Sequence, residues 1–339
     1  MDSLSQIVLG AAVGEIAWGR KMGNRAQLIG AIGGTIPDLD ILFNSFWTDP
    51  IDQLRIHRGY SHSMFIHLLM AIPFAWVTWR WMKSRITWKE SYIVWYLFFF
   101  THTLLDCCTT YGTQLFLPFT DYLVGFNTIS VVDPLWTVPF LFALLVCLFL
   151  KRTNPRRLRW AKLGAAYSLV YLGFTLVNKG IAHSHFSDSL EQKGIPYNTL
   201  STSPSILNSI LWSGVAVTSD SIYIGEYSVL QDDPEVDFVS YARGLHHLDP
   251  IASTREVKTL QWFSQGLYFC EQNEDTTRFY LAKWGRMDYR QNEAENAFVF
   301  HWELVRSNTG LTARQIQAKW DESEFNDALR QLFRRIRNK

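Results

Sequence analysis

Residues 91–110 read SYIVWYLFFFTHTLLDCCTT and combine the length of a transmembrane helix with two ionisable side chains. A helix needs about 20 mostly apolar residues to cross a bilayer. His102 and Asp106 stand four residues apart, so both side chains lie on one face of such a helix. Because an ionisable group inside a membrane is costly, its presence there indicates function. This stretch therefore predicts a membrane helix that carries part of a polar site.

Similar apolar segments fill most of the first half of the chain. Two clear ones cover residues 64–82 and 134–150, and another runs from Trp160 to about Ala182. Two weaker segments, 4–19 and 26–43, are rich in Gly and Ala, which suit close helix packing in lipid. Residues 1–185 are therefore predicted to form an α-helical polytopic membrane domain of about six spans.

Basic residues cluster in three short connections between these segments. Because Lys and Arg gather on the cytoplasmic side, the clusters predict a multi-pass protein of a bacterial inner (plasma) membrane. The N-terminus and the C-terminal part then lie on the periplasmic or outer side, and the inverted topology is the alternative. The clusters are Arg20, Lys21 and Arg25; Arg80, Lys83, Arg85 and Lys89; and Lys151, Arg152, Arg156, Arg157 and Arg159.

The second half of the chain has a different pattern. Short alternating runs such as 215–230 (VAVTSDSIYIGEYSVL) and 278–284 (RFYLAKW) fit antiparallel strands. They predict a small soluble, mainly β domain over residues 186–305, followed by a polar C-terminal helix or tail over 306–339. This half has no nucleophile motif and no Gly-rich phosphate loop, so we interpret it as a cover or a substrate-recognition module.

Composition narrows the function classes. The 339 residues include 32 basic and 31 acidic ones, a balance that argues against nucleic acid as a partner, since phosphate binding needs a concentrated positive face. The four cysteines form no C-x-x-C pair and are predicted to be buried thiols. The N-terminal segment lacks a basic n-region, so it is expected to stay as the first span.

Three motifs place histidine and aspartate within or beside the apolar segments. With the predicted topology they meet at similar depth near the outer boundary of the membrane. Imidazole and carboxylate suit zinc above all, with manganese or iron as alternatives, and six ligands could hold one ion or two. Taken singly, PDLD could be a helix-ending turn and H-x-x-x-D an internal hydrogen bond. The motifs are PDLD (Asp38, Asp40), HRGYSH (His57, His62) and HTLLD (His102, Asp106).

Other polar residues have predicted supporting roles. Arg58 is expected to bind an anionic substrate group, or alternatively a lipid headgroup. Asp133 is expected either to support the ligands from behind or to cap a helix, and Glu15 and Gln6 to reach the same cavity. His67 is interpreted as a packing residue. Four further histidines are interpreted as surface residues, namely His183, His185, His246 and His247.

At these residues the chain resembles the bacterial inner-membrane metal-dependent hydrolase family of the YdjM type, described in connection with LexA regulation. The resemblance is strong over residues 1 to about 140, while 203–212 (SPSILNSILW) and 262–268 (WFSQGLY) are similar to an extended branch of that family. Many members have His where this chain has Gln6. The matching features are MDSLSQIVLGAAVGE at the start, PDLD (37–40), HRGYSHS (57–63), HTLLDCCTTYGTQLF (102–116) and VDPLWT (132–137).

The resemblance implies a membrane-bound hydrolase whose metal ligands are Asp38, Asp40, His57, His62, His102 and Asp106. The leading hypothesis is metal-assisted hydrolysis of an ester or phosphoester in a lipid or lipid-linked substrate, in which Asp40 or Asp106 accepts the proton. Membrane lipids and a small-molecule or lipid substrate are then the partners. The rival hypotheses are a transporter of metal ions or protons and a non-enzymatic membrane regulator with a structural metal.

Overall fold

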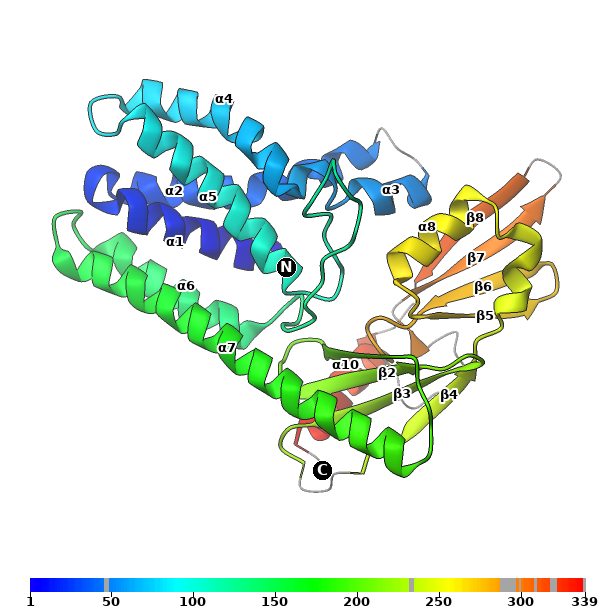
Figure 1. The fold of residues 1–339 in the computed structure, drawn as a ribbon. Coiled ribbons are helices and arrows are strands. Elements are labelled where there is room, and N and C mark those ends of the chain that lie inside the picture. Colours follow the sequence, from blue (N-terminus) through cyan, green and yellow to red (C-terminus); the bar gives the residue numbers. More distant parts are fainter. Residues whose placement is uncertain are drawn as a thin grey trace. The chain divides into compact units, whose positions relative to one another are not determined.

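The computed structural model describes residues 1–45, 49–231, 235–286, 297–298, 300–307, 310–317 and 322–337. The chain divides into two compact units. The first unit contains residues 1–48 and 55–174, and the second contains 49–54 and 175–339. Figure 1 shows the elements of both units, coloured along the sequence.

Helices form most of the first unit, and a long irregular loop over residues 108–133 completes it. Two of the helices, α3 and α7, continue into the residues of the second unit. In chain order the helical elements are α1 (Ser3–Met22), α2 (Asn24–Thr35), the 3-10 helix η1 (Ile36–Ser45), α3 (Pro50–Ile56), the 3-10 helix η2 (Tyr60–His62), α4 (Met64–Met82), α5 (Trp88–Cys107), α6 (Pro134–Phe149) and α7 (Pro155–Gln192).

Polar residues explain where several of these helices begin. The Asp2 side chain accepts a hydrogen bond from a backbone N–H in the first turn of α1. Thr87 and Glu90 form a reciprocal capping box at the start of α5. Asp133 caps α6 and is followed by Pro134, whose missing N–H costs nothing in the first turn of a helix. Local sequence therefore fixes the starting points of the helices on which the site depends.

Helices α1 and α2 pack with their backbones in contact. A Cβ atom on Gly10 would lie 2.2 Å from the carbonyl oxygen of Gly30, and one on Gly14 would lie 2.2 Å from that of Ala26. Only glycine fits at such an approach. The prediction that the small residues of these segments serve close helix packing is confirmed.

Aromatic side chains fill the space between α2, α4 and α5. Trp95, Phe98 and Phe99 of α5 are buried in one core with Trp18 of α1. Phe98 lies so close to α2 that a Cβ atom on Gly33 would come within 2.6 Å of its ring. This contact fixes α5 against the end of α2, where the polar site begins.

The prediction of about six membrane spans is wrong. Among the described residues, α7 is the one helix long and apolar enough to cross a membrane, and a bent pair, Pro50–His62 with Met64–Met82, is a second candidate. The other predicted segments fail for physical reasons. Helices α2 and α6 have only 12 and 16 residues, α1 carries Glu15 with Arg20 and Lys21, and the apolar part of α5 is diluted by Lys89, Glu90 and Asp106.

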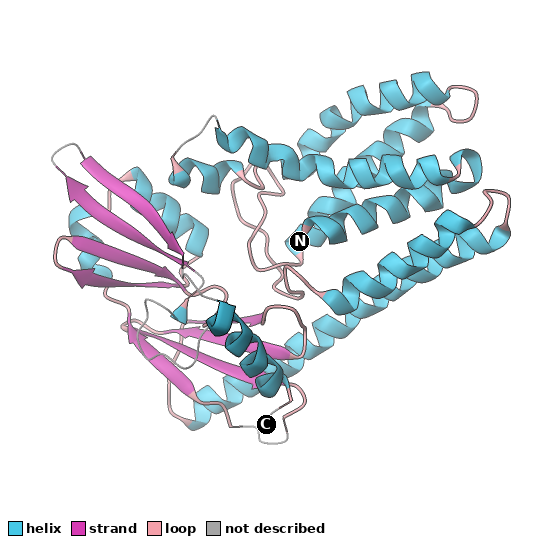
Figure 2. Cartoon of the chain, turned by 180° about the vertical axis from the view of Figure 1, so that it is seen from behind, coloured by secondary structure: helices cyan, strands magenta, loops and turns pink. Residues whose placement is uncertain are grey.

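The second unit contains two four-stranded antiparallel sheets, which Figure 2 shows in magenta. In each sheet the strands pair in sequence order, as in a meander. The first sheet consists of β1 (Thr199–Pro204), β2 (Leu211–Val217), β3 (Ser221–Ser228) and β4 (Phe238–Ala242), and the second of β5 (Tyr268–Asn273), β6 (Thr276–Leu281), β7 (Phe300–Ser307) and β8 (Gly310–Gln317). Helical elements follow each sheet, namely η3 (Leu245–Ile251) and α8 (Arg255–Ser264) after the first and α10 (Glu322–Ile336) after the second.

The first sheet is packed on both faces. Phe186 in the C-terminal half of α7 lies over β2, where a Cβ atom on Gly214 would come within 2.5 Å of the phenyl ring. On the other face, Val215 and Ile224 share a core with Phe269 and Tyr280 of the second sheet. Glycine at position 214 is therefore what allows the helix to approach the strand.

The C-terminal part departs from the sequence prediction in two places. Helix α7 runs to Gln192, past the predicted boundary at 185, and the predicted tail contains strand β8 (Gly310–Gln317) before its helix α10. The cysteines are free thiols, and Cys107, Cys147 and Cys270 are buried as predicted, whereas Cys108 is half-buried. Burial raises the pKa of Cys270 to about 12.

Candidate metal centre

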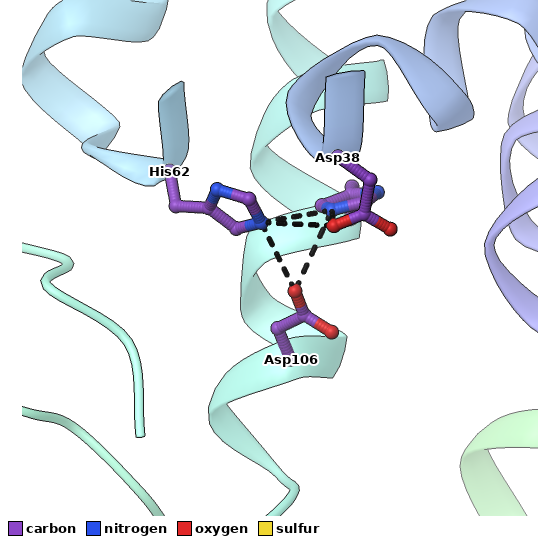
Figure 3. A group of neighbouring side chains, drawn as sticks. Asp38, His62 and Asp106 are labelled. Carbon is purple, nitrogen blue, oxygen red and sulfur yellow. Dashed lines mark hydrogen bonds and ion pairs between the residues drawn. The ribbon is translucent and has the colours of Figure 1, made fainter. Parts of the chain in front are cut away.

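Four side chains from three separate elements point toward one another in the first unit. Asp38 comes from η1, His62 from η2 and Asp106 from α5 (Figure 3). His102 lies one turn before Asp106 on α5. One potential ligand atom from each residue lies within 4.8 Å of the other three. Within the described residues, no second group of three or more His, Cys, Asp or Glu meets this condition.

The spacing of these atoms is close to uniform. The Nε2 atom of His62 lies 3.1 Å from Asp106 Oδ2, 3.4 Å from Asp38 Oδ1 and 3.2 Å from His102 Nε2. The Nε2 atom of His102 lies 3.4 Å from Asp38 Oδ1 and 3.5 Å from Asp106 Oδ2. Neighbouring ligands around a tetrahedral zinc ion are about 3.3–3.4 Å apart, because each is about 2.0–2.1 Å from the metal. Five of the six separations are therefore those of a tetrahedral ligand set, and the sixth, between the two carboxylate oxygens, is within 4.8 Å.

Hydrogen bonds on the far side of each imidazole fix its tautomer. His102 donates from Nδ1 to the Gly34 carbonyl oxygen at 2.7 Å. The hydroxyl of Ser61 donates to Asp40 Oδ2 at 2.8 Å, so Nδ1 of His62, at 2.9 Å from that hydroxyl, is the donor between the two. With both Nδ1 atoms protonated, each Nε2 presents a lone pair to the centre of the group.

The ligand atoms of the four side chains therefore face one buried centre. When both imidazoles are neutral, two Nε2 atoms and two carboxylate oxygens face one another with no hydrogen between them. His62, His102 and Asp106 have no exposed side-chain surface, and that of Asp38 is 16% exposed. Such acceptors repel each other unless a cation lies among them or a proton is added. This donor set fits a divalent metal ion.

Asp106 is held from the side opposite the group. Its Oδ1 atom accepts a hydrogen bond from Gln6 Nε2 at 3.0 Å and pairs with Arg58 Nη2 at 3.2 Å and with the amino group of Met1. Arg58 also donates to Thr109 Oγ1 at 3.1 Å and lies over the ring of Tyr111, and only 4% of its surface is exposed. These contacts direct Oδ2 of Asp106 toward the two imidazoles.

Asp40 and His57 lie beside the four-residue group and contact each other. Asp40 Oδ1 is 3.0 Å from His57 Nδ1, and Oδ2 accepts hydrogen bonds from Ser61 and from the backbone N–H of Arg58. Asp40 approaches His62 on its Nδ1 side, at 3.6 Å, away from the Nε2 atom that faces the group. The six predicted ligands are therefore divided into a group of four and an adjacent pair.

A family model described as YdjM inner membrane protein matches residues 1–182, more than half of the 339-residue chain. The chain belongs to the YdjM inner membrane protein family. The resemblance seen in the sequence motifs is confirmed. No curated protein and no solved structure matches the chain.

The part of the chain that matches the YdjM family contains every residue of the site. Its last matched residue lies within α7, so both β sheets fall outside the match. The family description gives an inner-membrane protein, in agreement with the predicted membrane association.

Two carboxylates that were predicted to contribute to the metal centre, Glu15 and Asp133, lie elsewhere in the part of the chain that matches the YdjM family. Glu15 forms a buried bidentate pair with Arg157, through oxygen–nitrogen distances of 2.6 Å, and accepts a hydrogen bond from Gln27. Asp133 caps α6 and accepts the hydroxyl of Tyr171. Of the two roles considered for Asp133, the structure places it in the helix cap.

The remaining histidines are outside the group. His67 is fully buried and donates from Nε2 to the Ser61 carbonyl oxygen at 2.9 Å, as a packing residue does. His183 and His246 are exposed. His185 is half-buried and stacks on Tyr227, and His247 is half-buried against His246.

Three contributors to the site were not identified from the sequence. Ser61 links His62 to Asp40, Thr109 holds Arg58, and the Gly34 carbonyl sets the tautomer of His102. Ser61 lies inside the HRGYSH motif, so its position between the two histidines was a usable signal. The Gly34 contact is made by backbone, for which side-chain chemistry gives no signal.

Proposed function

We propose that this YdjM-family protein is a membrane-associated, metal-dependent hydrolase that acts on an ester or phosphoester of a lipid or lipid-linked substrate. The observation that carries the proposal is the set of four buried or half-buried ligand atoms of Asp38, His62, His102 and Asp106, all within 4.8 Å of one another. We propose zinc as the ion, with manganese or iron as alternatives, because two imidazoles and two carboxylates suit all three.

A divalent ion held by these residues supplies a Lewis acid that polarises the scissile group and activates water. The chain itself supplies orientation and charge. Neutral His62 and His102 with two carboxylates carry a charge of −2, which offsets that of the ion, and Arg58 lies against the outer oxygen of Asp106. Asp38 is the least buried of the four, so we propose that substrate approaches from its side.

The second candidate is a non-enzymatic membrane regulator in which the metal ion has only a structural role and holds the helices together. The observation in its favour is the number of ligands, since four protein ligands close a tetrahedral zinc site and hydrolysis needs an open position. Zinc would have to accept a fifth ligand, as catalytic zinc does, whereas six-coordinate manganese would keep two open positions. A structural ion, however, has no use for the adjacent His57, and the presence of this histidine supports hydrolysis.

Transport has less support among the described residues. Glu15 lies on α1 between Gln6 of the site and the basic end of the helix at Arg20 and Lys21, where a path away from the site would pass. It is held on both carboxylate oxygens by Arg157. A relay of ions or protons through Glu15 would have to break this buried pair.

The test combines metal analysis with an ester screen on detergent-purified protein. We expect bound divalent metal in the wild type, its loss in His62→Ala/His102→Ala, and cleavage of at least one lipid ester or phosphoester by the wild type alone. A metal-loaded protein that is inert toward lipid esters, phosphoesters and peptides would refute hydrolysis and favour the regulator. Wild-type protein without metal would refute both candidates.

A further inference from the structure

His57 is positioned differently from every other histidine near the metal centre. Its Nδ1 atom lies 3.0 Å from Asp40 Oδ1, so the carboxylate holds the proton on Nδ1. Its side chain is 21% exposed, whereas that of His62 has no exposed surface. Among the residues that the structure describes, Nε2 of His57 has no hydrogen-bond partner. One nitrogen of the ring is therefore fixed and the other is open.

Both carboxylate oxygens of Asp40 are engaged by hydrogen bonds outside the four-residue group. Its Oδ1 atom is occupied by His57, and its Oδ2 atom accepts from Ser61 at 2.8 Å and from the Arg58 backbone at 3.0 Å. The last contact depends on an unusual backbone, since Arg58 has a φ of 59°, in the left-handed region that few non-glycine residues adopt. The left-handed backbone conformation of Arg58 therefore points its N–H at Asp40.

The pair lies next to the metal centre. The ring centroids of His57 and His62 are 6.3 Å apart, compared with 5.0 Å for the two ligands His62 and His102. The ring of His57 also meets Tyr111 edge-on, at 5.3 Å between centroids. At this distance His57 stays outside the ligand group but close enough to reach one end of a substrate held there.

His67 shows what a packing histidine looks like in the same region. It is fully buried, and its Nε2 atom is used in a hydrogen bond to the Ser61 carbonyl. His57 is half-buried, has a carboxylate behind it and keeps Nε2 open. A carboxylate-held imidazole with one open nitrogen is the arrangement of a proton donor or acceptor.

We propose that His57 is the general acid of the hydrolysis and that Asp40 is its positioning residue; this rests on the proposed function. As the oxygen of water bonds to the phosphorus atom, the bond from phosphorus to the leaving oxygen breaks. The electron pair goes to the leaving oxygen, which takes the proton from Nε2 of His57. The attacking water releases a proton to solvent, and His57 takes up a proton from solvent at Nε2 to become an imidazolium again. The reaction therefore needs no further reactant.

The test uses two phosphoesters that differ only in their leaving alcohol. Phosphatidyl-4-nitrophenol releases 4-nitrophenolate, which is stable enough to leave without a proton. Phosphatidylethanol releases ethanol, whose oxygen needs a proton in order to leave. We expect His57→Gln to lose about 10²–10⁴-fold in rate on phosphatidylethanol and less than about tenfold on phosphatidyl-4-nitrophenol. Asp40→Asn should show the same selectivity with a smaller loss. Metal content should match the wild type in His57→Gln.

Each alternative outcome has a distinct meaning. Equal losses on the two esters, with metal retained, would overturn the acid role and leave the proposed function intact. Loss of metal from His57→Gln would show that His57 is a ligand and also overturn the acid role. Metal-loaded wild type that cleaves neither ester would refute phosphoester hydrolysis and the acid role together. His57→Ala is the second variant, and its unfolding midpoint is measured in detergent. A loss of rate that both variants share cannot come from a folding defect of His57→Gln alone.

Discussion

The Nδ1 atom of His102 in α5 donates a hydrogen bond of 2.7 Å to the carbonyl oxygen of Gly34 in α2. This bond connects a predicted metal ligand directly to the backbone of a helix that is packed through glycine. Gly34 lies in the last turn of α2, so the bond gives a partner to a carbonyl near the end of this helix. The orientation of the ligand therefore depends on how closely α2 approaches its neighbours.

Substitution in the glycine contact should disturb both stability and metal binding. A Cβ atom on Gly30 would lie 2.2 Å from the Gly10 carbonyl, so Gly30→Leu should force α1 and α2 apart and lower stability by roughly 1–3 kcal/mol. We expect a lower unfolding midpoint in detergent and reduced metal content. Gly173→Leu is the control, because a Cβ there meets no atom within 4 Å. Equal effects of the two changes would contradict the interpretation.

Removal of metal should destabilise the first unit, since the ligands come from three elements. At free metal of 100 times Kd, binding contributes about 2.7 kcal/mol, and a chelator should abolish that contribution. Acidification should release the ion as well, because His62 and His102 bind it only when neutral. The measurements are metal content and thermal unfolding with and without chelator. His183→Ala, at an exposed histidine, should behave as wild type.

Arg58 should be important for stability as well as for the site. Arg58 is 4% exposed and its guanidinium bridges Asp106 and Thr109, so Arg58→Ala removes one of the two cationic partners of a buried carboxylate and should cost about 3–5 kcal/mol. Arg55→Ala is the matched control. Arg55 pairs with Asp121 at 3.7 Å on the surface, where such a pair contributes about 0–1 kcal/mol. Denaturant unfolding in detergent distinguishes the two.

The buried pair of Glu15 and Arg157 should support the fold without affecting the metal. Glu15→Ala should cost about 3–5 kcal/mol, because it leaves the Arg157 charge buried and unpaired. The double change Glu15→Leu/Arg157→Met should cost much less. Asp327→Ala, at an exposed pair with Arg330, serves as control. Loss of metal in folded Glu15→Gln would instead show that Glu15 supports the ligands.

The orientation of α7 can be tested with reporter fusions. Its N-terminal end carries Arg156 and Arg159 and follows Lys151 and Arg152, so the charge rule predicts that this end is cytoplasmic. We expect a cytoplasmic reporter to be active after residue 154 and an external reporter to be active after residue 196. Arg157 adds less to this bias, because it is neutralised by Glu15. The reversed pattern would place the β sheets in the cytoplasm.

Much of the site was predictable because its chemistry is local in sequence. The spacing of His102 and Asp106 on a helix, and the occurrence of aspartate and histidine in PDLD and HRGYSH, report residue types that bind metal wherever they meet. The strands of the second unit and the glycine contacts of α1 and α2 were predictable for the same reason, since alternation and small residues are read over a few positions.

The number of spans was not predictable in this way. Average hydropathy over 26–43 does not reveal that α2 ends at Thr35 and that a 3-10 helix follows it from Ile36. Helix ends depend on single caps and prolines, which a window of 20 residues averages away. Helix α7, in contrast, has 38 residues, so a window of 20 residues lies entirely within it and its apolar character remains visible in the average.

The sequence by itself determined the family and the residue types of the metal centre, together with the position of the β-rich half. Only the tertiary structure decided that Asp38, His62, His102 and Asp106 form the group while Asp40 turns to His57 and Glu15 to Arg157. The physical reason is that a ligand set is defined by distances of about 3 Å between atoms of separate elements. Those distances follow from helix packing and backbone hydrogen bonds, which no spacing along the chain records.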